Sequence, residues 1–203
     1  MDIKNIYKKP KALNINVTNM LHMEQKIYKY EVILNLIRDN NHLRKIAKEL
    51  NTNHMTIKRV LDSLVKENVL DVKKQGRNNI FSIKRTLEAQ SVVFSAELYN
   101  FSRFINRHIE LKQDIMKLKS LPLNIIVIFG SYAKGNATNK SDIDIYAETE
   151  DNKIKRELEK INSKFSVKIG RYNKDSLLIK EIERDHIIVK GVEQFYEKNK
   201  FFG

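Results

Sequence analysis

The chain has 203 residues, a formal net charge of +13 at pH 7 and no cysteine. This length suits one or two domains, the missing cysteines exclude disulfides and thiolate metal sites, and the positive charge favours a polyanionic partner. No apolar run approaches the length of a membrane span, and no signal-peptide core is present, so we expect a cytoplasmic protein with no membrane partner. Residues 1–22, rich in Lys and Asn, are predicted to form a flexible basic arm.

Three amphipathic helices are predicted next, because apolar side chains recur at helical spacing over residues 26–39, 43–50 and 54–67. Asn53 is a suitable N-cap for the third helix. The side chains that this helix is expected to bury are Ile57, Val60, Leu61 and Leu64. Residues 69–72 and 80–83 then alternate as strands, and residues 73–79 between them are predicted to form the basic tip of a hairpin.

Residues 46–50, residues 55–64 and the basic hairpin together resemble the winged helix-turn-helix domain of small prokaryotic transcription regulators, which we place at residues 23–85. The resemblance implies that the third helix enters the major groove of double-stranded DNA and that the hairpin contacts the backbone or minor groove. The residues predicted to contact DNA are Asn53, His54, Thr56, Lys58, Arg59, Lys73, Lys74 and Arg77.

The distribution of charge favours DNA binding by this half of the chain. Residues 1–85 hold 18 Lys and Arg against 8 Asp and Glu, whereas residues 86–203 hold 20 against 17. The alternative is a winged helix that serves protein contacts or dimerisation, because a fold alone does not determine function.

Residues 86–120 contain neither Pro nor Gly and are predicted to form a helical connector, as one long helix or two with a break. Phe94, Tyr99, Phe101 and Phe104 form an aromatic stripe along it. Core packing or a dimer seam explains such a stripe better than a cofactor surface, so we expect a homodimer.

The second half opens with the apolar strand 125–129, which leads into Gly130-Ser131 and a short helix. A polar loop follows, and a further strand is predicted to carry Asp142 and Asp144 on one face, because side chains alternate along a strand. Two adjacent carboxylates repel each other, and a divalent cation such as Mg²⁺ neutralises them. A chance Asp-x-Asp on an ordinary strand–turn–helix is the alternative.

This pattern resembles the GS-x-A-x-G…SD-x-D signature of the polymerase β-like nucleotidyltransferases, in particular their minimal domains. The signature positions are Gly130, Ser131, Ala133, Gly135, Ser141, Asp142 and Asp144. The resemblance implies a nucleoside triphosphate with Mg²⁺ or Mn²⁺ on Asp142 and Asp144, which would be both metal ligands and catalytic residues. The residues expected to bind the nucleotide are Gly130, Ser131, Lys134, Gly135 and Ser141.

The resemblance also implies a third carboxylate on a later strand, which we place at residues 164–170. Ser166 and Lys168 occupy the expected face of that strand, so no carboxylate is found there. Glu148, Asp175 and Glu181 are the candidates to replace it from elsewhere. Its absence would weaken activation of the nucleophile more than binding of the nucleotide.

The predicted fold is therefore α+β with two domains, the C-terminal one a nucleotidyltransferase fold with a mixed sheet and helices at residues 121–203. The first functional hypothesis is a DNA-binding protein that transfers NMP to a hydroxyl group on an unknown acceptor, such as RNA or the toxin protein of a toxin–antitoxin pair. The second is a winged-helix transcriptional regulator whose nucleotidyltransferase domain is a catalytically weak nucleotide sensor or a scaffold.

Overall fold

The computed structural model describes residues 17–203, and no helix in this part of the chain is long and apolar enough to cross a membrane. The first sixteen residues of the predicted arm lie outside the described residues. The remaining residues of the arm, 17–22, belong to α1, which begins nine residues before the predicted start of the first helix. In chain order, the elements of the N-terminal unit are α1 (Val17–Arg38), β1 (Asn41–His42), α2 (Leu43–Glu49), α3 (His54–Lys66), β2 (Leu70–Gln75) and β3 (Asn78–Ile83).

Two consecutive helices then lead into the C-terminal unit. The elements of this second half are α4 (Leu87–Arg107), a short 3-10 helix (Ile109–Leu111), α5 (Lys112–Ser120), β4 (Ile126–Phe129), α6 (Gly130–Lys134), β5 (Ile143–Glu148), α7 (Asn152–Ile161), β6 (Phe165–Gly170), α8 (Leu177–Arg184), β7 (Ile187–Lys190) and α9 (Val192–Lys198).

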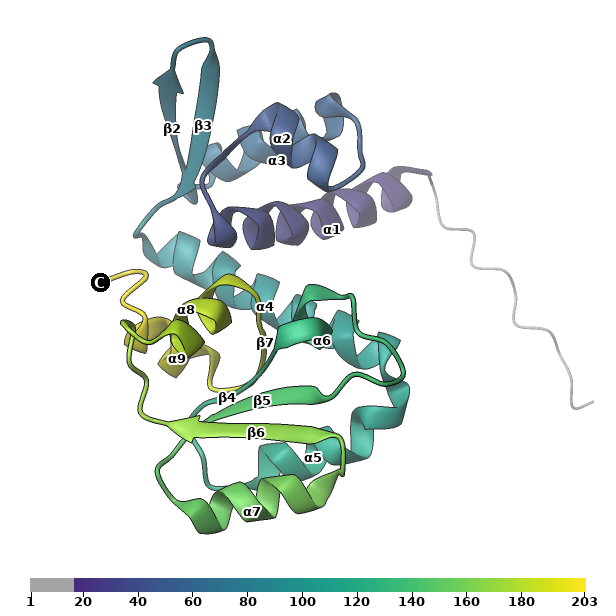
Figure 1. Ribbon diagram of the computed structural model, residues 1–203. Helices are drawn as coiled ribbons and strands as arrows, with labels where there is room; N and C mark the ends of the chain where they lie inside the picture. Colours follow the sequence, from purple (N-terminus) through teal and green to yellow (C-terminus); the bar gives the residue numbers. More distant parts are fainter. Residues whose placement is uncertain (1–16) are drawn as a thin grey trace, which may run out of the picture.

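The N-terminal unit packs three helices against an antiparallel sheet with the strand order β1-β3-β2 (Figure 1). All four side chains expected inside α3 are buried. Asn53 caps this helix as predicted, because its side chain accepts a hydrogen bond from the backbone N–H of Thr56 at 2.8 Å. The two-residue strand β1 was not predicted, since a strand this short has no periodicity to detect.

The hairpin differs from the prediction at its tip. β2 and β3 pair as far as Gln75 and Asn78, so that Lys73 and Lys74 lie within β2 and the turn contains only Gly76 and Arg77. Gly76 has a φ of +59°, which glycine adopts without strain. The predicted loop was too long because polar side chains on an exposed hairpin hide the strand alternation: β2 is exposed from Asp71 onward.

The C-terminal unit is built on a mixed four-stranded sheet in the order β6-β5-β4-β7, in which only β5 and β6 are parallel. Helices α5 and α7 cover one face (Figure 1), where Leu118 and Leu158 pack against apolar side chains such as Ile145. Helices α8 and α9 cover the other face, and Ile182 and Phe195 belong to the same core as Val127. The two faces follow from the alternation of side chains along the strands.

The predicted connector is two helices with a break at His108, and it is part of the core (Figure 1). α4 contacts both α1 and β7, so the two units share one apolar core through Val93 and Ala96. Its aromatic stripe also packs within the chain: the ring of Phe94 lies 5.7 Å from that of Tyr196. This contact agrees with the core packing that was expected for the stripe, and the homodimer remains a prediction.

A polar network is buried between α4 and the strand β7. His186 Nδ1 lies 2.7 Å from the carbonyl oxygen of Ile182, and its Nε2 lies 3.1 Å from Glu97 Oε1. The Tyr196 hydroxyl donates a hydrogen bond to the same carboxylate oxygen at 2.6 Å. Because a carbonyl oxygen only accepts hydrogen bonds, Nδ1 carries a hydrogen, and the facing carboxylate favours the charged imidazolium.

This network predicts a pH-dependent contribution to stability. Burial lowers the pKa of His186, but the charge and hydrogen bond of Glu97 outweigh it and hold the pKa above the ordinary 6.5. The stabilising charge pair is fully present below about pH 6.5 and is lost as the pH rises through the raised pKa. We therefore expect the stability margin of wild type over His186→Gln, measured by urea unfolding, to be larger at about pH 6 than at about pH 9. An equal margin at both pH values would contradict this.

Candidate functional site

The site residues Gly130 and Asp144 meet where β4 and β5 lie side by side. Phe129, the last residue of β4, is paired with Asp144, and Gly130 follows directly with a φ of +67°. A Cβ atom added to Gly130 would lie 2.3 Å from Oδ2 of Asp144. Glycine is required here for two independent reasons, since any side chain would collide with the carboxylate and would strain a left-handed backbone.

Asp142 and Asp144 are close enough for their charges to interact, although β5 begins between them at Ile143. Asp142 directly precedes the strand and is exposed, whereas Asp144 lies within the strand and is half-buried. Burial raises the pKa of Asp144, and the charge of Asp142 raises it further. A half-buried carboxylate beside a second one is a site that gains from a bound cation.

Ser166 and Lys168 lie on the face of β6 where the third carboxylate was expected. In the parallel pairing of β5 with β6, Ser166 is the partner of Asp144, and Lys168 is the partner of Tyr146 one step further along. The Ser166 hydroxyl and the Lys168 ammonium group both lower the pKa of Asp144, although burial dominates. This strand thus provides a hydroxyl group and a cation in place of an acid.

Of the three candidates to replace that carboxylate, Glu181 is the one whose charge acts on Asp144. It lies on α8, over the same face of the sheet, and it raises the pKa of Asp144. Glu148 instead forms an ion pair with Lys198 at 2.9 Å, and Asp175 is exposed in the loop before α8. The sequence could not select Glu181, because the position of α8 over the sheet depends on long-range packing.

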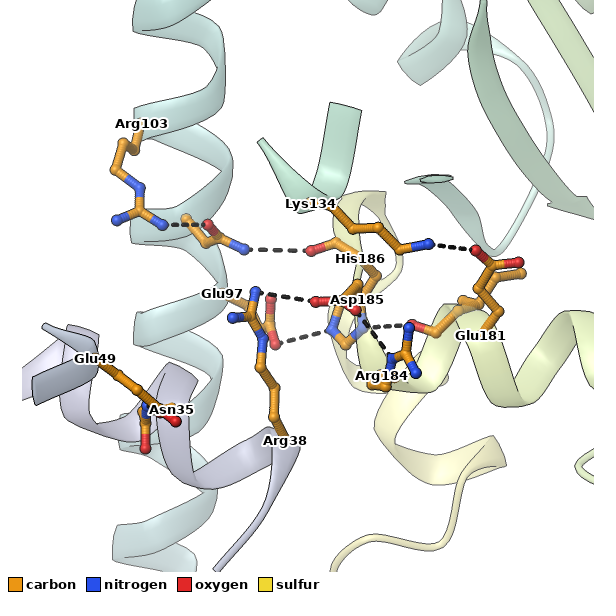
Figure 2. Close-up of polar contacts among 12 residues, drawn as sticks. Asn35, Arg38, Glu49, Glu97, Arg103, Lys134, Glu181, Arg184, Asp185 and His186 are labelled. Carbon is orange, nitrogen blue, oxygen red and sulfur yellow. Dashed lines mark hydrogen bonds and ion pairs between the residues drawn. The ribbon is translucent and has the colours of Figure 1, made fainter. Parts of the chain in front are cut away.

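Lys134, predicted to bind the nucleotide, is held by Glu181. Its Nζ atom lies 2.7 Å from Glu181 Oε1, a contact that joins α6 to α8 (Figure 2). Ser131 is half-buried in α6, and its carbonyl oxygen accepts a hydrogen bond from the N–H of Asn136.

The two remaining residues predicted to bind the nucleotide have evident structural roles. Gly135 ends α6 in the left-handed conformation with a φ of +74°. The hydroxyl of Ser141 accepts a hydrogen bond from the Thr138 N–H at 2.9 Å and thereby shapes the loop before Asp142. Both residues therefore shape the loop that connects the signature elements.

The residues present fit a divalent cation that is shared with a ligand. Among residues 17–203, no three His, Cys, Asp or Glu side chains gather closely enough to hold a metal ion by themselves. Mg²⁺ binds proteins commonly through one or two carboxylates, with phosphate oxygens and water completing its octahedron. Asp142 and Asp144 supply two such carboxylates. Their negative charges repel each other, and a bound cation would neutralise them.

The residues predicted to contact DNA lie on α3 and the hairpin. His54, Lys58 and Arg59 are exposed on α3, and Thr56 is half-buried. Asn53 is engaged as the N-cap. The remaining candidates, all exposed on the hairpin, are Lys73, Lys74 and Arg77.

Comparison with known families concerns the part of the chain that holds the carboxylates. Residues 111–194 match the model of the family described as Polymerase beta, Nucleotidyltransferase. The match begins at the end of the short 3-10 helix, ten residues before the predicted domain boundary, and does not include the N-terminal unit. No curated protein and no solved structure matches the chain. The segment that carries Gly130, Asp142 and Asp144 is therefore similar to the polymerase β nucleotidyltransferase family.

Proposed function

We propose that the C-terminal unit transfers a nucleoside monophosphate from a nucleoside triphosphate to a hydroxyl group, with pyrophosphate leaving. The observation that carries this proposal is the approach of Asp144 to Gly130, with Asp142 beside it, inside the segment that matches the nucleotidyltransferase family. A scaffold has no physical need to hold two carboxylates next to each other.

In this proposal Asp142 and Asp144 would hold a Mg²⁺ ion, which would supply positive charge to neutralise the phosphate oxygens. Gly130 leaves the space that the Asp144 carboxylate needs. Lys134 is placed to neutralise the triphosphate once it exchanges its partner Glu181 for phosphate oxygens. Glu181, thereby released, is the carboxylate best placed to accept the proton of the attacking hydroxyl group.

Transfer from α-labelled NTPs tests this function. The four nucleotides would be incubated with Mg²⁺ or Mn²⁺ and wild-type protein, first alone and then with cell extract, beside the double variant Asp142→Asn/Asp144→Asn. Label on RNA or protein that depends on the two carboxylates supports the transferase and separates the acceptor classes. Metal-dependent nucleotide binding without transfer would support the alternative, a nucleotide sensor, which the Ser166 and Lys168 positions favour.

We also propose that the N-terminal unit is a winged helix-turn-helix that binds double-stranded DNA. Its element order and its three-stranded sheet support the fold. A hollow of about 500 Å³ between α3 and the hairpin is lined by Arg44, Lys58 and Arg77, for which the described residues offer no ion-pair partner. Unpaired cations on α3 and the hairpin suit a phosphate backbone.

Arg59→Ala is expected to weaken DNA binding and to lower the slope of log K against log salt by about 1, because one phosphate contact is lost. The matched control is Arg156→Ala, which removes the same charge from an exposed position on α7, on the far face of the other sheet. Fluorescence anisotropy at several salt concentrations measures both. DNA affinity that is unchanged in Arg59→Ala, or equally weakened in both variants, would favour a unit that serves protein contacts.

A further inference from the structure

A cationic pocket of about 410 Å³ lies where the two units meet. It is lined by the last residue of α1, the C-terminal half of α4 and the α6 segment of the signature. Four of its lining residues are Arg38, Arg103, Arg107 and Lys134, and no Asp or Glu is among the described residues that line it. Figure 2 shows three of these side chains, which come from segments far apart in the chain.

The cations keep hydrogen-bond donors for a ligand. Arg38 pairs with Asp185 at 3.3 Å, and Arg103 pairs with Glu31. A guanidinium group has five N–H donors, and one carboxylate uses two at most. These carboxylates do not line the pocket, nor does Glu181, the partner of Lys134.

Arg107 differs from the other three cations of the pocket in that it has no carboxylate partner among residues 17–203. It is exposed at the end of α4 and forms no ion pair within the described part of the chain. A multiply charged anion that enters this hollow meets four cations and, among the described lining residues, no carboxylate. Arginine forks match phosphate oxygens in two-point contacts, so phosphate groups fit this lining best.

We propose that this pocket binds a chain of phosphate groups, as in the tail of a nucleoside triphosphate or a free polyphosphate. Three of the four cations lie outside residues 111–194, so the pocket is a feature of this chain beyond the family segment. Arg38 belongs to the N-terminal unit and Lys134 to the signature helix. A phosphate chain bound in this pocket would therefore contact both units beside the signature helix α6.

Inorganic tripolyphosphate, without metal, is the probe for this pocket. Isothermal titration calorimetry of the full chain is expected to show one site, which Arg107→Gln weakens about tenfold, the value of one charge-assisted contact. Lys134→Gln is expected to weaken the same site. Arg156→Gln, which removes an exposed charge on α7, is expected to leave the affinity unchanged.

Competition between ATP and tripolyphosphate shows whether the pocket binds the tail of a nucleoside triphosphate or a free polyphosphate. Metal-free ATP that displaces tripolyphosphate assigns the pocket to the nucleotide tail, whereas simultaneous binding of both assigns it to a separate polyphosphate. Asp144→Asn must retain tripolyphosphate binding, so loss of the transferase activity does not affect this test. The proposal is overturned if tripolyphosphate does not bind at about 0.15 M salt, or if Arg107→Gln and Arg156→Gln weaken it equally.

Discussion

Asp144→Asn is expected to reduce nucleotidyl transfer at least about 100-fold, because one of the two carboxylates proposed to hold a Mg²⁺ ion is removed. Its folded state should be as stable as that of wild type or more so. Burial and the charge of Asp142 both raise the pKa of Asp144, which means that the folded structure disfavours its negative charge. Asn has the same shape and removes that charge.

The control for this variant is Glu157→Gln, which removes one negative charge from an exposed position on α7. This helix covers the face of the sheet opposite to Asp144. Initial rates of label transfer and thermal unfolding would be measured for all three proteins. Transfer by Asp144→Asn at the wild-type rate would remove Asp144 from the site. Loss of activity together with unfolding would show that the carboxylate stabilises the fold, contrary to the direction of its pKa.

Gly130→Ala is expected to lose more stability than Gly135→Ala and to lose activity, whereas Gly135→Ala should keep most of its activity. Both glycines have a positive φ, so each variant bears about 1–2 kcal/mol of left-handed strain. Only at Gly130 does the new methyl group meet an obstacle, Oδ2 of Asp144 at 2.3 Å, while the space around Gly135 is open within 4 Å. Relief of the collision would cost about 1–3 kcal/mol more.

The effect of Gly130→Ala on activity should exceed its effect on stability. The methyl group displaces the Asp144 carboxylate, and a shift of about 1 Å in a reacting group can cost about 100-fold in rate. Urea unfolding and transfer rates would be measured for both variants. Because only Gly130→Ala adds the collision with Asp144, the difference between the two variants separates this collision from backbone strain. Equal losses in Gly130→Ala and Gly135→Ala would show that strain alone accounts for them and that Asp144 does not depend on this glycine.

The local features of the site were predictable because they follow from neighbours in the chain. The apolar run of residues 125–129 and the Gly130 turn need only short-range rules, and the family match bears out a nucleotidyltransferase domain there. The face of β6 that carries Ser166 was also predicted correctly, since alternation alone determines it.

The rest depends on contacts between distant segments. α4 of the predicted connector packs against both units, and the periodicity of residues 86–120 does not show which elements it contacts. The pairing of Lys134 with Glu181 joins residues 47 positions apart, and the cationic pocket combines side chains from α1, α4 and α6. α9 was missed as well, because seven residues provide too little helical pattern.

Binding of a nucleoside triphosphate with and without Mg²⁺ tests the central claim most directly, that Asp142 and Asp144 form a metal-dependent nucleotide site. Calorimetry would compare wild type with Asp142→Asn/Asp144→Asn, each in Mg²⁺ and in EDTA. We predict that Mg²⁺ tightens binding to wild type and has no effect on the double variant, which keeps only metal-independent binding. Equal stimulation by Mg²⁺ in both proteins, or none in wild type, would contradict the account.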